Sequence, residues 1–412
     1  MEFFDKLETR DPAEREREQL AALRRQIAHA QKSAPYFARV LAGAAPEDIA
    51  DRAALARLPV TRKSDLTDLQ KAAPPFAAMA AVAPGELSRI FASPGPVFDP
   101  EGRRPDYWRI ARAMHAAGFR RGEIVHNAFS YHFTPAGSMF DLGAQALGCA
   151  VIPAGTGQTE MQVQAIAGLR PQCYGGTPSF LRIILEKADE MGADVASVRK
   201  ALVSAEALPG SLREWLRQRG VATLQCYASA DLGLIAYESP AMEGLIVDEG
   251  VIVEIVRPGT GDPVPEGEVG EVAVTALTPE YPLIRFATGD LSAVLAGPSP
   301  CGRTNLRIKG WMGRADQTTK VKGMFVKPGQ VAEVARRHPQ VRRYRLVVDH
   351  DERKNDRMTL KCEADGAGGE ALAAAIADSI RAVCNLRGEV AFEPAGSLPK
   401  DGKVIDDVRK HE

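Results

Sequence analysis

The sequence lacks an excess of either charge. Its 412 residues include 52 Lys and Arg against 53 Asp and Glu, which gives a formal net charge of -1. Nucleic acids and anionic membranes are bound through concentrated positive charge, and the chain as a whole does not supply it. We therefore expect no nucleic-acid and no membrane partner, and a small-molecule ligand becomes the favoured class.

Cysteine and histidine are sparse and scattered. The six cysteines never form a C-x-x-C pair, and the seven histidines show neither H-x-x-x-H nor H-E-x-x-H spacing. Disulfide frameworks and zinc sites need such clusters. We expect reduced, mostly structural thiols and no dedicated metal cage, so any metal would arrive with a substrate.

Long hydrophobic runs are also missing. No segment approaches the length that spans a bilayer. The N-terminus, MEFFDKLETRDPAERE, is acidic where a signal peptide needs a basic start and an apolar core. This pattern predicts a cytoplasmic protein. Because 412 residues exceed what one hydrophobic core usually supports, at least two domains are expected.

Short apolar strands alternate with amphipathic helices between Glu123 and Gly233. The alternation is typical of parallel βαβ units whose helices cover both faces of a sheet. Ligands of such sheets bind beyond the carboxyl ends of the strands. The loops at these ends should therefore converge on one site, and they span residues 130–137, 155–157, 204–208 and 227–233.

The pattern changes beyond Ala236 to short strands with turn signals, which predicts an antiparallel β subdomain. The C-terminal part holds a further alternation of strands and helices that could fold alone. We therefore predict an α/β fold with two domains. A large N-terminal domain, residues 1–315, would contain parallel βαβ sheets and the β subdomain, and a small α+β C-terminal domain would contain residues 316–412.

A short strand, RIFAS, runs into the turn Ser93-Pro94-Gly95-Pro96, and a helical pattern follows from Tyr107. A strand, a small-residue turn and a helix form the usual setting for phosphate binding, because backbone N–H groups and the helix N-terminus attract an anion. The two prolines have no N–H to donate, and no lysine follows them. These residues alone favour an ordinary turn.

Eight motifs occur in the order in which one family carries them. They are the opening DKLETRDPAERE with LPVTRKSDL, the loop SYHFTPAG, the strand GCAVIPAGTGQT, the turn GGTPSF, the loop SAEALPGSLR, the stretch VRPGTGDPVPEGEVGEVAVTALTPEYPLIRFATGDL, the hinge GRADQTTKVKGMFVKP and the tail LPKDGKVIDDV. With these motifs, nearly the whole chain resembles the adenylate-forming enzymes, and within that superfamily the phenylacetate-coenzyme A ligases.

The resemblance implies a site for ATP or AMP. By similarity, the Asp290 carboxylate holds the ribose hydroxyls, Arg314 reaches ribose or phosphate oxygens, and Tyr227 stacks on adenine. Without the resemblance, Asp290 reads as a turn residue after Gly289, and Tyr227 as a buried tyrosine at a strand end. The other implied positions of the nucleotide site are Ser93, Ser204, Ala205, Glu206, Ala207, Ala228 and Ser229.

The resemblance also implies a pocket for an aryl carboxylic acid of the phenylacetate or benzoate type. Aromatic and small residues suit a flat ring. His132 could hydrogen-bond a substituted ring or satisfy a neighbouring carbonyl group. The implied pocket residues are Tyr131, His132, Phe133, Ala136, Gly137 and Gly155.

A two-step reaction follows from the resemblance. The acid attacks the α-phosphate of ATP with Mg2+ present, and Lys403 contacts the acid and that phosphate; Lys400 is a nearby alternative. The small domain then rotates about Asp316, and the thiol of coenzyme A attacks the acyl-adenylate. Asp231 would help to hold Mg2+. Family members commonly pair, so a homodimer is expected.

Two departures from the family leave alternatives open. The phosphate loop, Ala92 to Val97, is shortened and contains prolines, and Asp231 stands where the family has Glu. The first alternative is an adenylate-binding or acyl-nucleotide-binding protein that lacks ligase activity. The second is a ligase that loads the phosphopantetheine thiol of a carrier protein in place of coenzyme A.

Overall fold

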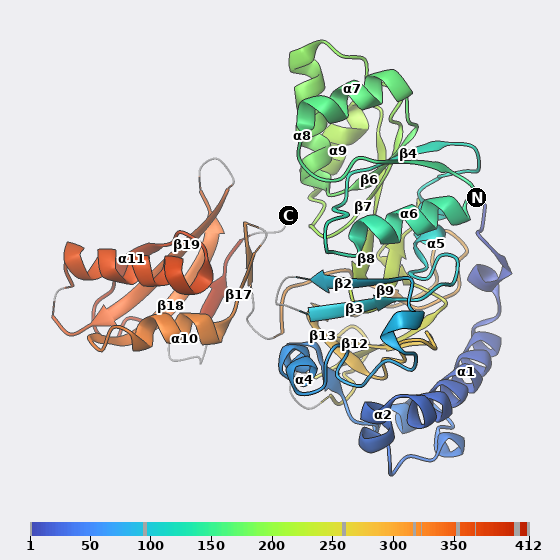
Figure 1. Ribbon diagram of the computed structural model, residues 1–412, viewed down its shortest axis with the longest axis horizontal. Coiled ribbons are helices and arrows are strands. Elements are labelled where there is room, and N and C mark those ends of the chain that lie inside the picture. The colour runs from blue at the N-terminus through green and yellow to red at the C-terminus, as the bar shows by residue number, and fades with distance from the viewer. Residues whose placement is uncertain are drawn as a thin grey trace. The chain divides into compact units, whose positions relative to one another are not determined.

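The computed structural model describes residues 2–93, 97–257, 261–315, 319–322, 324–351, 355–366, 368–398 and 404–409 (Figure 1). The chain divides into two compact units, Met1–Gly313 and Arg314–Glu412. The predicted hinge, Asp316, lies outside the described residues. The hinge and the predicted domain limits at that residue therefore stay predictions.

Nine strands form a mixed sheet in the first unit. They are β4 (Ile124–Asn127), β5 (Ala150–Pro153), β6 (Cys173–Gly176), β7 (Lys200–Val203), β8 (Ala222–Ser229), β9 (Gly233–Glu238), β10 (Leu245–Val247), β14 (Val294–Leu295) and β15 (Arg307–Ile308). Their order is β14-β15-β10-β9-β8-β7-β6-β4-β5. The five strands from β8 to β5 are parallel, as the alternation of strands and helices predicted.

Helices cover both faces of the parallel strands (Figure 1). The helices are α5 (Ile110–Ala116), α6 (Ala136–Ala146), α7 (Thr159–Leu169), α8 (Pro178–Met191) and α9 (Gly210–Gln218). Cys173 and Leu202 pack with residues of α5 and α6, whereas Tyr174 and Ala201 pack with residues of α7, α8 and α9. Neighbouring residues of a strand point to opposite faces, so each strand contributes to two separate cores.

A second sheet of four strands has the order β1-β13-β12-β11. Its strands are β1 (Thr61–Arg62), β11 (Val251–Val256), β12 (Gly270–Ala276) and β13 (Phe286–Ser292). It shares a core with N-terminal helices. The N-terminal helices are α1 (Pro12–Ser33), α2 (Pro35–Val40), α3 (Arg52–Ala56) and α4 (Leu66–Ala72), with short 3-10 turns η1 (Lys6–Thr9), η2 (Pro46–Asp48), η3 (Lys63–Asp65) and η4 (Pro84–Glu86). Among the helices in the described parts of the chain, none is both long and apolar enough to cross a membrane.

The antiparallel subdomain begins later than the sequence predicted. β9 turns back and pairs with β8, and β10 pairs with β9, so both extend the large sheet. The second sheet is built from β11, β12 and β13, with the short strand β1 at its edge. The alternating pattern predicts strands, but the choice of sheet depends on which edge each strand meets, and this information is not local.

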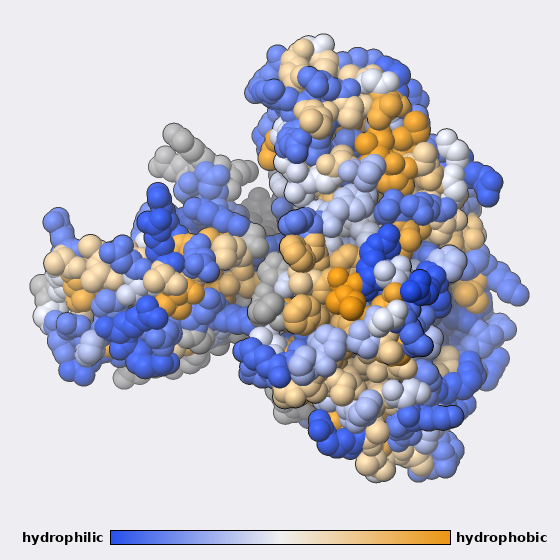
Figure 2. Space-filling model, viewed as in Figure 1, coloured by the Kyte–Doolittle hydropathy of each residue, from blue (hydrophilic) through white to orange (hydrophobic). Residues whose placement is uncertain are grey.

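The predicted strand, turn and helix around residue 93 is instead a β-hairpin. β2 (Arg89–Ser93) pairs antiparallel with β3 (Val97–Glu101), and the connecting residues 94–96 lie outside the described part. The pairing places Ser93 and Asp99 on the inner face of the hairpin. On the outer face Ile90 is 47% and Phe98 is 37% exposed, and Figure 2 shows apolar side chains gathered over this hairpin.

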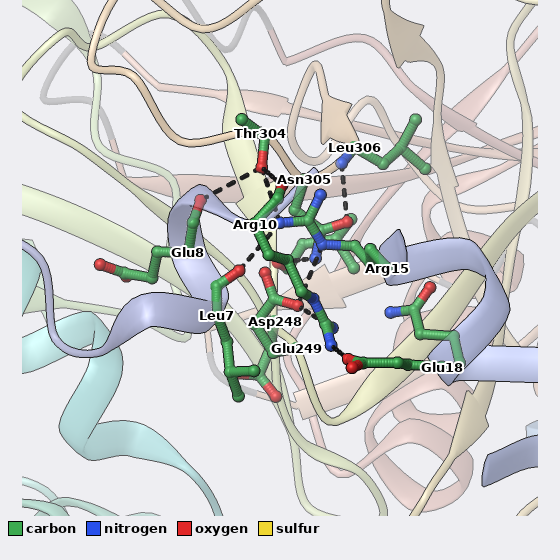
Figure 3. Close-up of polar contacts among 12 residues, drawn as sticks. Leu7, Glu8, Arg10, Arg15, Glu18, Asp248, Glu249, Thr304, Asn305 and Leu306 are labelled. Atoms are coloured by element: carbon green, nitrogen blue, oxygen red, sulfur yellow. Dashed lines mark hydrogen bonds and ion pairs between the residues drawn. The ribbon is translucent and has the colours of Figure 1, made fainter. Parts of the chain in front are cut away.

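Buried charges attach the N-terminal segment to the first unit (Figure 3). The Arg10 and Arg15 guanidinium groups lie 2.6 and 3.1 Å from the carboxylate of Glu249. Arg15 also donates to Thr304 Oγ1 (2.8 Å), and that hydroxyl donates to the Arg10 carbonyl (2.6 Å). Buried ion pairs need such additional hydrogen bonds to offset the loss of hydration. The opening motif of the chain therefore has a structural role.

The second unit contains a hairpin and a sheet of four strands. Its elements are β16 (Thr319–Val321), β17 (Met324–Val326), α10 (Pro328–Arg336), β18 (Val341–His350), β19 (Asp356–Ala364), α11 (Glu370–Cys384), β20 (Glu389–Phe392) and β21 (Ile405–Asp407). The sheet order is β20-β19-β18-β21. Residues of α10 and α11 pack against the sheet in one hydrophobic core. The unit therefore has its own core.

Candidate active site

Loops that follow the parallel strands lie side by side at one edge of the large sheet. The Gly155 amide donates to the Asn127 carbonyl across β4 and β5 (3.1 Å). The Ser204 amide donates to the Gly176 carbonyl across β6 and β7 (3.2 Å). Carboxyl ends of parallel strands are the usual ligand-binding edge of an α/β sheet.

The loop after β4, which holds the predicted acid pocket, is fixed by Asn127. The side-chain amide nitrogen of Asn127, Nδ2, donates to the Tyr131 hydroxyl (2.7 Å) and to the Gly137 carbonyl (2.8 Å). A Cβ atom at Gly137 would lie 2.6 Å from the Ser130 carbonyl oxygen, so only glycine fits there. Burial, and then the charge of Asp141, raises the pKa of Tyr131, which keeps the phenol neutral.

The aromatic side chains of this loop are open to solvent. Phe133 is 66% exposed, and its ring meets the His132 imidazole edge-on at 4.7 Å between centroids. The Phe133 carbonyl accepts a hydrogen bond from the Ala92 amide (2.9 Å), which joins the loop to the β2–β3 hairpin. Ala136 begins α6. Both interpretations of His132 stay open.

A buried histidine that the sequence did not single out supports Gly155. His126 Nε2 lies 2.7 Å from the Gln162 side-chain oxygen. Gln162 in turn donates to the carbonyls of Gly155 (2.9 Å) and Gly157 (2.7 Å). Burial lowers the pKa of His126, so the imidazole is neutral near pH 7. The pair holds the loop after β5 in one conformation.

The predicted adenine loop after β7 is held at its start and open beyond it. The Ser204 hydroxyl donates to the Cys226 carbonyl (2.9 Å), which ties the loop to β8. Ala205 has a left-handed backbone with φ 69°. Glu206 is exposed and accepts a hydrogen bond from the Ser179 hydroxyl (2.6 Å), and Ala207 is exposed.

Asp290 lies in a bulge of β13 and not in a turn. Thr288, Gly289 and Asp290 together lie opposite the single residue Val272 of β12. Such bulges re-aim side chains. The Tyr227 hydroxyl donates to Asp290 Oδ2 (2.8 Å), so a strand end of the large sheet contacts the second sheet at this carboxylate. The roles of Asp290 and Tyr227 toward a nucleotide stay predictions.

Asp231 lies on the turn between β8 and β9, and its side chain is 1% exposed. Its Oδ2 atom forms an ion pair with the Lys63 ammonium. Its Oδ1 atom is buried and has no hydrogen-bond partner among the described residues. Ala228 and Ser229 precede the turn, and the Ser229 hydroxyl accepts from the Leu232 amide (3.3 Å). A buried carboxylate oxygen without a partner suits a hard cation.

A second buried carboxyl group, Asp99, lies near Asp231. The Ser93 hydroxyl donates to Asp99 Oδ2 (3.0 Å), and no described residue hydrogen-bonds Oδ1. Burial, and then the Asp231 charge, raises the pKa of Asp99, although the Lys63 ammonium acts in the opposite direction. Asp99 is therefore protonated in a range where an exposed carboxyl group is ionised.

Sequence reasoning missed Lys63 and Asp99. Lys63 belongs to the motif LPVTRKSDL. This motif contributes to the family resemblance, but the resemblance assigns no chemical role to its residues. Asp99 is a single acidic residue in the strand VFDPE, and no local pattern marks it. The described residues contain no group of three or more His, Cys, Asp or Glu that could hold a metal ion.

Several predicted residues cannot be placed in this site. Lys403 and Asp316 lie outside the described residues. Arg314 is the first residue of the second compact unit. The catalytic, hinge and phosphate roles of these residues stay predictions.

Comparison with known proteins gives the family. Residues 107–277 match the family model described as AMP-binding enzyme. The chain is 32% identical to the phenylacetate-coenzyme A ligase of Thermus thermophilus over 83% of this chain and 79% of that protein. It is 32% identical to the phenylacetate-coenzyme A ligase of Escherichia coli over 80% of this chain and 78% of that protein.

The fold resembles that of a further ligase. The crystal structure of 2-hydroxyisobutyryl-CoA ligase in complex with 2-HIB-AMP and CoA matches with a TM-score of 0.82 and 23% identity, over 98% of this chain and 92% of that one. At this identity the likeness concerns the fold alone. The sequence relatives show the family: the chain belongs to the phenylacetate-coenzyme A ligase-like family of AMP-binding, adenylate-forming enzymes.

Proposed function

We propose that this protein joins an aryl carboxylic acid, of the phenylacetate or benzoate type, to coenzyme A through an acyl-adenylate. Membership of the family supports the reaction class. The observation that best supports a nucleotide-binding site is the position of the Asp290 carboxylate, which the bulge in β13 presents beside Tyr227. A carboxylate in this setting can accept hydrogen bonds from both ribose hydroxyls.

The acid would bind against the loop after β4. The exposed face of Phe133 and the small residues Ala136 and Gly137 offer a wall that suits a flat ring. The neutral Tyr131 phenol, which Asn127 holds, could fix a polar substituent or the carboxylate itself. These residues support an aryl acid as the substrate class.

The phosphates of ATP would lie on the side of Asp231. The unpartnered Oδ1 atom of Asp231 fits Mg2+, which would neutralise phosphate charge when bound. Lys63 places a positive charge at the same carboxylate. Mg2+ and the Lys63 ammonium would together supply part of the positive charge that the sequence predicts to be missing from the phosphate loop.

The reaction would proceed in two steps. The carboxylate of the acid attacks the α-phosphorus of ATP and pyrophosphate leaves; the thiol of coenzyme A then attacks the acyl carbonyl carbon and AMP leaves. Lys403 would contact the acid and the α-phosphate in the first step. Rotation of the small domain about Asp316 would withdraw Lys403 before the second step.

Acid-dependent exchange of labelled pyrophosphate into ATP tests the first step. A panel of aryl and short aliphatic acids with Mg2+ should give the fastest exchange with an aryl acid, because the wall of the pocket is aromatic. Exchange with aliphatic acids alone would contradict the substrate class. No exchange with any acid would contradict ligase activity.

One observation favours a second candidate, an adenylate-binding protein without ligase activity. Asp99 adds a second buried carboxyl group near Asp231, on the side where a triphosphate needs donors and cations. The Ser93 hydroxyl already donates to Asp99 Oδ2 and does not face outward as a phosphate donor, and AMP and acyl-adenylates need fewer such donors than ATP. Binding of AMP without any pyrophosphate exchange would select this candidate.

The acyl group could be transferred to one of two acceptor thiols. Coenzyme A and the phosphopantetheine of a carrier protein present the same terminal thiol, so the geometry of the first step applies to both. Acid-dependent release of AMP with coenzyme A would support the ligase reaction. Release only with a loaded carrier protein would select the alternative acceptor.

A further inference from the structure

The Asp290 carboxylate already has a protein donor on each oxygen. Tyr227 donates to Oδ2 (2.8 Å), and the indole Nε1 of Trp311 donates to Oδ1 (3.1 Å). Both donors thus approach the atoms that a ribose would use. Hydrogen bonds to an ionised carboxylate are stronger than those between neutral groups, so an incoming hydroxyl has to compete with them.

The two donors differ in how firmly they are held. Tyr227 is partly buried, and its hydroxyl also lies 3.1 Å from Thr288 Oγ1. Trp311 is 40% exposed. An indole at the surface can rotate away with little loss of packing, whereas the tyrosine ring is packed against the core shared with the N-terminal helices. Trp311 is therefore the donor that can leave.

The backbone that carries Trp311 is attached directly to β13. The Met312 amide donates to the Leu291 carbonyl (2.9 Å), and the Leu291 amide donates to the Gly313 carbonyl (2.8 Å). These bonds keep the indole beside Asp290 as long as the segment stays paired. The same segment ends at Gly313, the last residue of the first unit.

We propose that Trp311 occupies the ribose side of the Asp290 carboxylate in the nucleotide-free protein and that a bound nucleotide displaces its indole. This inference rests on the proposed function, which assigns Asp290 to the ribose. Two vicinal hydroxyls can take both carboxylate oxygens, while an indole has one N–H. Trp311 then lowers the affinity for nucleotides whose ribose hydroxyls have to take its place at Asp290.

The test compares Trp311→Phe with wild type and with the control Trp215→Phe. Trp215 lies on α9, where its ring stacks under the Arg219 guanidinium at 4.2 Å and packs against the core that α7, α8 and α9 share. By calorimetry, Trp311→Phe should bind AMP roughly three- to tenfold more tightly, because one charge-assisted hydrogen bond no longer competes. Affinity for 2′,3′-dideoxy-AMP should not change, since that ligand has no hydroxyl to compete.

Tryptophan fluorescence gives an independent readout. AMP should change the emission of wild type and of Trp215→Phe but not that of Trp311→Phe. If wild type prefers AMP to its dideoxy analogue and Trp311→Phe binds AMP equally or more weakly, the displacement is wrong while the nucleotide assignment stands. If wild type binds neither ligand, or binds both equally, Asp290 does not hold the ribose, and the nucleotide assignment falls together with this inference.

Discussion

The Asp231 carboxylate forms an ion pair with Lys63, a residue 168 positions earlier in the chain. Lys63 comes from the 3-10 turn before α4, and Asp231 from the turn between β8 and β9. Burial alone would lower the pKa of Lys63, but the charges of Asp231, Asp99 and Asp290 outweigh it and the pKa of Lys63 is raised. One ammonium group thus serves several carboxyl groups of the candidate site.

Replacing Lys63 should destabilise the fold. Lys63→Met leaves the Asp231 carboxylate buried and uncompensated, and removing one partner of a fully buried pair costs about 3–5 kcal/mol. The side chain of Lys63 is 33% exposed, so a smaller loss of about 1–2 kcal/mol is expected. Urea unfolding measures this change in the free energy of unfolding.

The control for Lys63 is an exposed pair. Lys71→Ala removes the partner of Asp68, where both side chains lie largely in solvent, and should change stability by less than about 0.5 kcal/mol. The double variant Lys63→Met with Asp231→Asn should recover much of the loss, because no buried charge then lacks a partner. Equal losses in the single and double variants would contradict the coupling.

Replacing Asp99 should stabilise the fold in a pH-dependent way. The pKa of Asp99 is raised in the folded protein, so below the unfolded value of about 4 the group is protonated in both states. As the pH rises, the unfolded chain releases the proton first, and folding stability falls. Asp99→Asn removes this penalty. Its gain in melting temperature should be small near pH 4 and should grow toward pH 8.

Thermal unfolding between pH 4 and pH 8 checks the Asp99 prediction. Asp68→Asn, at a highly exposed carboxylate, provides the matched control and should show no such trend. A loss of stability that is the same at every pH would mean that Asp99 is ionised in the folded protein and is held by contacts that asparagine cannot make.

Gly233 should be required for the conformation of the Asp231 turn. Its φ is +70°, and a Cβ atom there would lie 2.7 Å from the Trp108 carbonyl oxygen. Gly233→Ala therefore meets both backbone strain and a clash and should cost more than about 2 kcal/mol. Gly220→Ala has φ +80° and open space around it, so it isolates the cost of strain, about 1 kcal/mol.

Denaturant unfolding of the two glycine variants measures the difference between their free energies of unfolding. Pyrophosphate exchange should fall further in Gly233→Ala than in Gly220→Ala, because the clash shifts the turn that carries Asp231. Equal losses of stability would show that the Trp108 carbonyl can move away at little cost.

Lys403 should act in the first half-reaction only. Lys403→Ala removes a charge aligned with the acid and the α-phosphate, and loss of such an oriented group lowers the rate about 100- to 1000-fold. Thioester formation from preformed acyl-adenylate should be spared. Lys400→Ala is the control and should retain both half-reactions; equal loss of both steps in Lys403→Ala would remove Lys403 from this role.

Much of the fold follows from local pattern. The parallel strands from β4 to β8 and their helices appear where the alternation of apolar and amphipathic segments predicts them, because each element has to bury one apolar face. The local pattern did not predict to which sheet β9 and β10 belong, since an alternating strand can pair with the edge of either sheet. The hairpin of β2 and β3 also differs from the prediction of a strand followed by a turn and a helix.

Within the site, local features of the sequence indicate the family, the candidates Asp290 and Asp231, and the loops at one edge of the sheet, because motifs and strand ends can be recognised without knowledge of the packing. The folded chain is needed to see that Lys63 pairs with Asp231, that Asp99 lies near them, and that Trp311 and Tyr227 both donate to Asp290. These contacts join residues far apart in the chain. Their energies depend on burial and on neighbouring charges, which packing creates and a linear pattern does not encode.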